Sequence, residues 1–458
     1  MPPCKDRAAN RATTLRKMTS SSLSEDDVAN ASHVMAERTT SMESRANDRS
    51  PFTSEELEDV IHSLHNITPK DANIDWEALE RLLAEVAHLS HKDWHVTGHN
   101  SDKMANILLP HDNDGLLTSS RSHQMFERIL HEGNWDGALS HARSMNNNID
   151  CDDEGENTTN KPCWAVLVTG VNGIRKTTSI YQPWFSKVMQ EALIAPPSSS
   201  SPEGDAKELF ALEDLPNGDN SFFRQLDHMI TTLCNENFST LYELTAAQLE
   251  KKNHEENNAT NDGDPPKELI QQYSNLKGSI FSRYRTLSEL LGVLLLKQAQ
   301  SSNMNTMCET SGRDIAMFHY INHFFPPQYN KLALHFTIND LGYAKQSVDA
   351  RMVREMNMGR EALASGDVVE VIYANAGGPY GSEVLEGVQA DSDRVWNEVI
   401  MKKGGKDDDD GVGVGNDWYK AEMRINAHEE KPWTIQAVRP DGSLGTEYTF
   451  GDARTVGL

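Results

Sequence analysis

The chain changes its hydrophobic pattern about a third of the way along. Before that point, residues 76–89 place apolar side chains at helical spacing, and residues 125–144 predict two more short helices. Thr53 and Glu56 have the spacing of a capping box, which predicts a helix directly after Thr53. We therefore expect residues 51–150 to form a helical region.

After residue 160 the pattern turns to short, continuous apolar runs of the kind that form buried strands. Three such runs are 164–168, 331–338 and 367–374, and a helix is expected over 344–364 between the last two. Strands that alternate with helices favour a layered α/β arrangement with a largely parallel sheet. We expect residues 160–400 to form one α/β domain.

Long helical patterns and polar segments fill the rest of that domain. Residues 221–249 and 268–300 are both expected to be helical. The polar segments offer little apolar surface to bury, so they predict surface loops. These segments are 196–205, 251–266 and 402–416.

The two ends of the chain differ in composition. Residues 1–50 are rich in Ser, Thr, Arg and Asp and contain no Phe, Trp or Tyr, which predicts a disordered tail. Residues 401–458 predict an acidic loop followed by an antiparallel hairpin. Its strands are expected at 433–438 and 446–450, joined by a turn at 440–442.

Composition and charge exclude several classes of function. The 458 residues carry a formal net charge of −26 and no apolar run of the ~20 residues that a membrane span needs. Because nucleic acids and anionic membranes require clustered Lys and Arg, we expect neither as a partner, and a phosphorylated substrate would need a local basic pocket. Five scattered cysteines indicate a reducing compartment and no structural zinc. We expect a cytoplasmic protein, with organelle import through the basic N-terminus as the alternative.

The strongest chemical signal is the stretch 163–179, CWAVLVTGVNGIRKTTS. A buried strand leads into a glycine-containing turn and then a helix, which is the order of a phosphate-binding loop. Gly170, Lys176 and Thr177 match G-x-x-x-x-G-K-[ST], and Arg175 stands where the second glycine belongs. The pattern predicts N–H groups that hold phosphate, a lysine at the β- and γ-phosphates, and a threonine hydroxyl on Mg²⁺. The predicted cofactor-binding residues are Gly170, Val171, Asn172, Gly173, Ile174, Arg175, Lys176, Thr177 and Thr178.

Arg175 leaves two interpretations of this loop open. The position usually needs a left-handed backbone, which costs a non-glycine residue about 1–2 kcal/mol. A decayed loop would be a strand, turn and helix that hold no nucleotide, whereas an adapted loop would gain a cation beside the phosphates. Lys176 and Thr177 are both present and Gly173 supplies a further glycine, which favours the adapted loop.

Phosphoryl transfer also needs an acid near the metal or the nucleophile. The best acids lie in residues 307–318, where Glu309 is expected at the end of a strand and Asp314 at the start of a helix. Glu309 is the second predicted Mg²⁺ ligand. The alternative is a capped helix in which Asp314 favours the helix dipole and Glu309 is solvated. Asp227, the first acid in an apolar helical pattern after the loop helix, is a further candidate base.

Cations for the developing charge are predicted on the helix at 344–364. Arg351 and Arg354 share one face at i, i+3 spacing and would close over phosphates, with Arg360 further along. The solvated face of an ordinary amphipathic helix explains the same spacing. A glycine-rich turn at 373–382 is expected at the sheet edge that carries the phosphate loop, where ligands bind in open α/β sheets.

The phosphate loop, taken together with the string ETSGR at 309–313, resembles the zeta-toxin-like kinases of the P-loop superfamily. The resemblance extends over 160–376. It implies that the loop lysine and threonine bind ATP and Mg²⁺, that acids at strand ends act near the substrate, and that arginines on a late helix close over the phosphates. The catalytic residues that it implies are Lys176, Glu309, Asp314, Arg351 and Arg354.

The sequence thus predicts an α/β, P-loop NTPase-like fold: a mostly parallel sheet flanked by helices, an N-terminal helical addition and a C-terminal β-hairpin. The first functional hypothesis is a phosphotransferase that uses Mg-ATP on an unknown acceptor. Two alternatives stay open, an NTPase or nucleotide switch without a small-molecule acceptor, and an interaction protein built on a degenerate nucleotide fold. If the backbone of Arg175 adopts the loop conformation and the cradle is open, the first two hypotheses are favoured.

Overall fold

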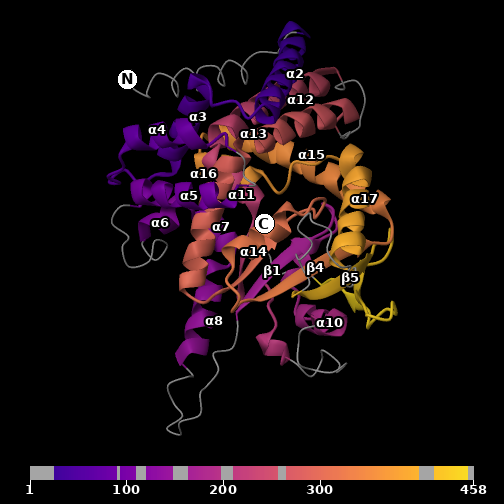
Figure 1. Ribbon diagram of the computed structural model, residues 1–458. Coiled ribbons are helices and arrows are strands. Elements are labelled where there is room, and N and C mark those ends of the chain that lie inside the picture. Colours follow the sequence, from indigo (N-terminus) through magenta and orange to yellow (C-terminus); the bar gives the residue numbers. More distant parts are fainter. Residues whose placement is uncertain are drawn as a thin grey trace.

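A twisted sheet lies at the centre of the molecule, with helices around it (Figure 1). The computed structural model describes residues 25–89, 93–109, 120–147, 163–196, 210–255, 265–401 and 417–451. Within these ranges seven strands form one sheet, in the order β2-β3-β1-β4-β5-β6-β7. The strands are β1 (Trp164–Thr169), β2 (Ser221–Arg224), β3 (Asn305–Glu309), β4 (Asn330–Ile338), β5 (Tyr419–Asn426), β6 (Thr434–Val438) and β7 (Tyr448–Thr449).

The sheet is parallel from β2 to β5 and antiparallel from β5 to β7. Both faces of β1 are buried, since Val166 and Val168 belong to one hydrophobic cluster while Ala165 and Leu167 belong to another. Burial on both faces is typical of a parallel sheet covered by helices. The prediction of an α/β fold with a mostly parallel sheet is confirmed.

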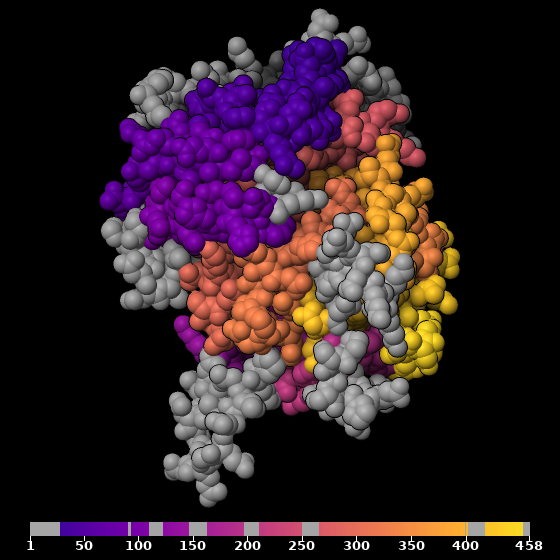
Figure 2. Space-filling model, viewed as in Figure 1, coloured from indigo at the N-terminus to yellow at the C-terminus, as the bar shows by residue number. Residues whose placement is uncertain are grey.

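Helices α2 to α6 lie together at the top and upper left of Figure 1, whereas α7 and α8 lead down beside the sheet, where α8 packs on β2. The capping box predicted at Thr53 and Glu56 is present at the start of α3. The surface of this region meets that of α14 directly (Figure 2). At this contact the ring centroids of Trp94 and Tyr320 lie 4.9 Å apart. The helices are α2 (Glu25–Asn47), α3 (Ser54–Ile67), α4 (Trp76–Val86), α5 (Trp94–Leu108), α6 (Ser120–Met125), α7 (Glu127–Glu132) and α8 (Trp135–Asn147).

One long helix joins this region to the sheet. Helix α13 (Lys267–Ser301) packs against α2 and α5 and also against α11, so it crosses the boundary between the two parts. No helix of the described ranges is long and apolar enough to cross a membrane. The remaining helices are α9 (Lys176–Ile180), α10 (Phe185–Ala192), η2 (Leu212–Asp214), α11 (Leu226–Leu233), α12 (Asn235–Glu255), α14 (Ala316–Phe324), α15 (Leu341–Ser365), α16 (Val368–Ala374), η4 (Ser382–Val384), α17 (Leu385–Val395) and η5 (Trp396–Ile400).

The prediction of a disordered tail at 1–50 is wrong for residues 25–47. Helix α2 occupies Glu25–Asn47 and packs on α12 and α13, with Met35 and Met42 buried. Met35 and Met42 are seven positions apart, so they lie on the same face of α2 and bury apolar surface against α12 and α13. This burial stabilises a helix that the polar composition of the segment did not predict. Residues 1–24 lie outside the described part of the chain.

Two secondary-structure predictions are also wrong. The run at 367–374 forms helix α16 instead of a strand, because Gly366 ends α15 with a φ of 73° and the Asp367 carboxylate then caps a new helix. The start of the helix predicted at 221–249 is strand β2, whose four buried residues are too few to show a period. Strand β5 was not predicted.

The C-terminal hairpin is confirmed, with β6 and β7 pairing in antiparallel fashion. The predicted loops fall mostly on residues outside the described part, namely 197–209, 256–264 and 402–416. Helix α12 extends to Glu255, into the loop predicted at 251–266.

Candidate functional site

The loop after β1 is shaped by residues with positive φ. Gly170 has a φ of 126° and Gly173 a φ of 82°. A Cβ atom at Gly170 would lie 2.5 Å from the carbonyl oxygen of Phe336, and one at Gly173 would lie 2.6 Å from that of Ala344. Both positions therefore require glycine, for conformation and for space. These contacts hold the loop between β4 and α15.

Arg175 adopts the left-handed conformation that this position needs, with φ 63° and ψ 29°, at the N-cap of α9. Its guanidinium carbon lies 4.6 Å from the ring centroid of Trp433 and 5.4 Å from that of Phe450. Burial lowers the pKa of this guanidinium from its ordinary value. The cation predicted beside the phosphates is thus engaged by the C-terminal hairpin.

Those ring contacts explain how arginine is tolerated here. A left-handed non-glycine residue costs about 1–2 kcal/mol. Each cation–π contact contributes about 0.5–2 kcal/mol, depending on how far it is desolvated. The two effects are of similar size, so Arg175 can hold the loop conformation as long as Trp433 and Phe450 stay in place.

Lys176, Thr177 and Glu309 converge at the end of the loop. The Lys176 Nζ atom donates hydrogen bonds to the carbonyl oxygens of Gly170 (2.7 Å) and Val171 (2.8 Å) and lies 3.1 Å from Glu309 Oε1. The Thr177 hydroxyl donates to Glu309 Oε2 at 3.3 Å. The sheet places these groups together, because Glu309 ends β3 directly beside Val168 of β1. A single carboxylate thus contacts both an ammonium and a hydroxyl.

This donor set suits Mg²⁺ better than a transition metal. In the described residues, no three His, Cys, Asp or Glu side chains are grouped so that they could hold an ion. Mg²⁺ is commonly held by one or two carboxylates together with substrate phosphates and water. The Thr177 hydroxyl and the Glu309 carboxylate are oxygen ligands of that kind, and they lie beside the predicted phosphate site.

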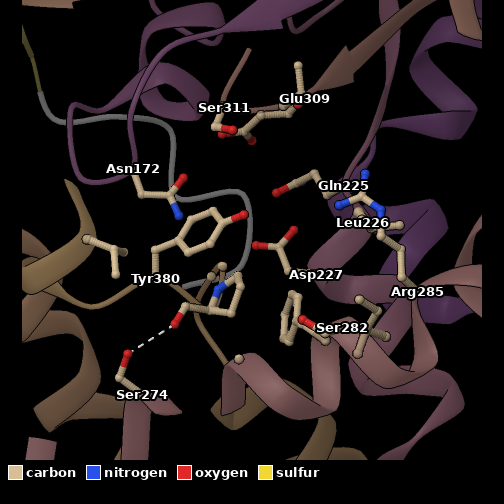
Figure 3. A pocket seen from close by; sticks show the side chains of 18 of the residues that line it. Asn172, Gln225, Leu226, Asp227, Ser274, Ser282, Arg285, Glu309, Ser311 and Tyr380 are labelled. Atoms are coloured by element: carbon tan, nitrogen blue, oxygen red, sulfur yellow. Dashed lines mark hydrogen bonds between the residues drawn. The ribbon is translucent and has the colours of Figure 1, made fainter. Parts of the chain in front are cut away.

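The loop opens into a cavity of about 980 Å³. Its walls come from the phosphate loop, the start of α11, one face of α13, the glycine-rich segment 376–381 and the ends of the N-terminal helices. Figure 3 shows Asn172, Glu309 and Ser311 on one side of this space and Ser282 and Arg285 on the other. The cavity is therefore longer than the phosphate loop alone would need.

Asp227 lies between these two sides. It is half-buried near the start of α11, and its carboxylate points into the cavity between Tyr380 and Gln225 (Figure 3). Burial raises the pKa of this carboxyl above its ordinary value, and the negative charge of Glu309 raises it further. A carboxylate in such surroundings holds a proton more readily than one in water, which is what a general base requires.

The structure places two of the three predicted arginines at the cavity. Arg351 and Arg354 both line the cavity, and Arg351 Nη2 donates to the carbonyl oxygen of Gly378 at 2.9 Å. Arg360 is not among the described residues that line it. Asp314, one residue before Ile315, the N-cap of α14, is exposed and lines the cavity, and it accepts a hydrogen bond from the backbone N–H of Ala316 at 2.9 Å.

A buried network fixes the glycine-rich segment opposite the loop. Glu355 of α15 accepts hydrogen bonds from Lys277 Nζ (2.7 Å), the Tyr273 hydroxyl (3.0 Å) and the backbone N–H of Ala376 (3.0 Å). Burial lowers the pKa of Lys277 to about 8, although Glu355 opposes this shift. A Cβ atom at Gly378 would lie 2.8 Å from Asn172 Nδ2, so this segment lies directly against the phosphate loop.

Sequence reasoning missed most of the far wall. Gln225, Ser282 and Arg285 line the cavity, and no motif pointed to them. Only the glycine run at 376–381 carried a recognisable signal. No protein-family model matches the chain, and no curated protein or solved structure matches it either.

Proposed function

We propose that this chain is a phosphotransferase that transfers the γ-phosphoryl group of Mg-ATP to an acceptor bound in the cavity. The observation that carries this proposal is the convergence of the Lys176 ammonium, the Thr177 hydroxyl and the Glu309 carboxylate at a loop with the left-handed residues of a phosphate cradle. The conformation of Arg175 supports a working loop over a decayed one.

The residues of the loop bind the donor. Backbone N–H groups at the start of α9 face the phosphates, and Lys176 exchanges the carbonyl oxygens of Gly170 and Val171 for phosphate oxygens. Thr177 and Glu309 would hold Mg²⁺, and the ion would supply charge neutralisation at the β- and γ-phosphates. Arg351 and Arg354 lie on the cavity wall, where they stabilise charge that develops in transfer.

Asp227 acts as the general base on the acceptor. The acceptor oxygen forms a bond to the γ-phosphorus, the bond from that phosphorus to the bridging oxygen breaks, and the hydroxyl proton passes to the Asp227 carboxylate. The raised pKa of Asp227 suits this role, because a base of higher pKa takes the proton with more driving force. Tyr380 and Gln225 flank it and can hydrogen-bond the acceptor.

A nucleoside triphosphatase is the second candidate, with water as the acceptor. The length of the cavity favours transfer over hydrolysis, since it continues past Asp227 to α13 and the N-terminal helices. Hydrolysis alone needs room for one water molecule. A hydrolase would leave that far wall without a role.

The proposal is tested by nucleotide-dependent thermal stabilisation. Mg-ATP at one hundred times its Kd is expected to contribute about 2.7 kcal/mol of stability, and EDTA should reduce that contribution. Parallel titrations with Mg-GTP establish which base is preferred, and ADP release measures turnover. If neither Mg-ATP nor Mg-GTP stabilises the protein, the donor site is refuted and the interaction-protein hypothesis is favoured.

A further inference from the structure

One face of α13 forms the far wall of the cavity. The residues of this face that line it recur every three or four positions, as expected for one side of a helix. A Cβ atom added at Gly278 would meet no atom within 4 Å apart from its chain neighbours and the backbone of its own helix, so the wall is open at its middle. Residues of this face that line the cavity include Gln271, Ser274, Gly278, Ser282 and Arg285.

Positive charge is in excess at the end of this face. Arg224 Nη1 lies 2.8 Å from Glu289 Oε2, and Arg285 Nη2 lies 3.6 Å from Glu289 Oε1. Two arginines therefore share one carboxylate. Arg224 and Glu289 are fully buried, whereas 31% of the Arg285 side chain is exposed, toward the cavity, and its buried Nε atom has no hydrogen-bond partner. The surplus charge is presented to the cavity by Arg285.

Among the residues that line the cavity, cationic side chains outnumber acidic ones, in contrast to the chain. Nine of the lining residues are Lys or Arg and six are Asp or Glu, while the chain has a formal net charge of −26. Arginine is the side chain best suited to a phosphate or carboxylate, because its planar fork donates two parallel hydrogen bonds. A cavity of this composition in an acidic protein favours a small anion over an extended polyanion, which the outer surface would repel.

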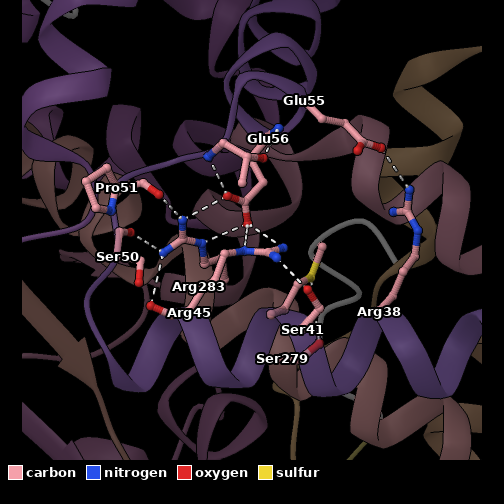
Figure 4. A network of polar contacts seen from close by, with 11 residues as sticks. Arg38, Ser41, Arg45, Ser50, Pro51, Glu55, Glu56, Ser279 and Arg283 are labelled. Atoms are coloured by element: carbon pink, nitrogen blue, oxygen red, sulfur yellow. Dashed lines mark hydrogen bonds and ion pairs between the residues drawn. The ribbon is translucent and has the colours of Figure 1, made fainter.

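The N-terminal helices close this end of the cavity. Arg283, on the turn of α13 before Arg285, pairs with Glu56 at 2.8 Å and donates to the carbonyl oxygens of Arg45, Ser50 and Pro51 (Figure 4). This network holds the junction of α2 and α3 against α13. Residues of that junction which line the cavity are Ala46, Asn47 and Arg49.

We infer, resting on the proposed function, that the acceptor is a small hydroxyl compound with an anionic group, a phosphate or a carboxylate. Its anion pairs with Arg285, its hydroxyl reaches Asp227, and Ser282 and Gln225, which lie near these two residues in Figure 3, supply neutral hydrogen-bonding partners. Arg285 is thus the specificity-determining residue for the acceptor.

Inorganic phosphate is the probe for this anion site. With a saturating, non-hydrolysable Mg-ATP analogue bound, phosphate is expected to raise the melting temperature of the parent further. Arg285→Gln should weaken the phosphate Kd about tenfold or more, because a charge-assisted contact is lost. Arg81→Gln, an exposed arginine of α4 outside the cavity, is the matched control and should leave the Kd unchanged. Acetate in place of phosphate separates a carboxylate site from a phosphate site.

Gly278→Phe tests the same site by filling it. The phenyl ring enters the open wall, so phosphate binding should be lost while the ATP analogue still binds. The inference is overturned if phosphate does not stabilise the parent, or if Arg285→Gln and Arg81→Gln behave alike. Failure of the donor site is a separate result: the ATP analogue would not bind, yet phosphate titrated without nucleotide into Lys176→Ala would still depend on Arg285.

Discussion

The two ends of the cavity are built in opposite ways. At the end that we propose binds the donor phosphates, called the phosphate end, Gly170 to Thr177 are contiguous, and Glu309 of the neighbouring strand completes the group. At the end that we propose binds the acceptor, called the acceptor end, the walls come from α2, α11, α13 and the segment 376–381, which are far apart in sequence. The phosphate end therefore depends on local backbone conformation, whereas the acceptor end depends on the packing of remote elements.

The difference implies that the two ends fail separately. Substitutions in the loop should change donor affinity, and substitutions in the far wall should change acceptor affinity or stability. Asp227 lies between them and should change turnover without changing either affinity much. A substitution at one end, or at Asp227 where the two ends meet, is therefore expected to leave ligand affinity at the other end unchanged.

The largest effect is expected at the meeting point. Asp227→Asn removes the base and should lower kcat by about 10²–10⁴-fold, measured as ADP release with water or an acceptor. A protonated carboxyl accepts no proton, so activity of the parent should rise with pH through a pKa above the ordinary Asp value, and Asp227→Asn should lack this rise. Unchanged nucleotide stabilisation is the control. Equal kcat in both proteins would contradict the assignment of Asp227.

The second prediction concerns the packing that supports the acceptor end. Glu56→Ala leaves Arg283 and Arg45 without their buried carboxylate and should cost about 3–5 kcal/mol in the free energy of unfolding by urea. Glu55→Ala is the matched control, because the neighbouring Glu55–Arg38 pair is exposed and should cost less than about 1 kcal/mol (Figure 4). Similar losses in both variants would show that this network does not hold α2 and α3 on α13.

A third prediction isolates the phosphate end. Lys176→Ala should weaken Mg-ATP binding roughly 10–100-fold, since charge-assisted contacts to phosphate are lost, and the fold should remain intact. Lys187→Ala, an exposed lysine of α10 outside the cavity, is the control. Phosphate binding at Arg285 should persist in both variants. Equal ATP affinity in Lys176→Ala and the parent would exclude this loop as the donor site.

The geometry of the phosphate end could be predicted from the sequence because it depends mainly on neighbours along the chain. Lys176 and Thr177 follow a buried strand at fixed spacing, and Glu309 could be placed because the carboxyl ends of parallel strands meet at one edge. The direction of the Arg175 side chain could not be predicted, since Trp433 and Phe450 are more than 250 residues away in sequence.

The acceptor end carried no comparable signal. Arg285 lies in a long helical pattern, and only the crossing of α13 with α11 brings it to the cavity. Helix α2 was predicted as disorder because its composition is polar, yet Met35 and Met42 bury it on α12 and α13. Composition measures how much apolar surface a segment has, and it does not show whether a partner surface exists. Remote packing decided both outcomes.

The smallest effect tests whether the C-terminal hairpin braces the phosphate end. Trp433→Ala removes a cation–π contact of about 0.5–2 kcal/mol, so the strained Arg175 conformation loses support and Mg-ATP should bind a few-fold more weakly. Arg175→Gly should also weaken binding a few-fold, because glycine is flexible at the N-cap.

The double variant decides between a brace and two independent contacts. With Arg175→Gly already present, Trp433→Ala should add almost nothing, because the contact that it removes no longer exists. The coupling free energy is the difference between the effect of the double variant and the sum of the two single effects. It should therefore approach the cation–π contribution, both in Mg-ATP affinity and in the free energy of unfolding. Strictly additive losses would show that Trp433 and Arg175 act separately. Coupling in unfolding but not in affinity would limit the hairpin to a structural role, and the phosphate end would then depend on its own contiguous residues alone.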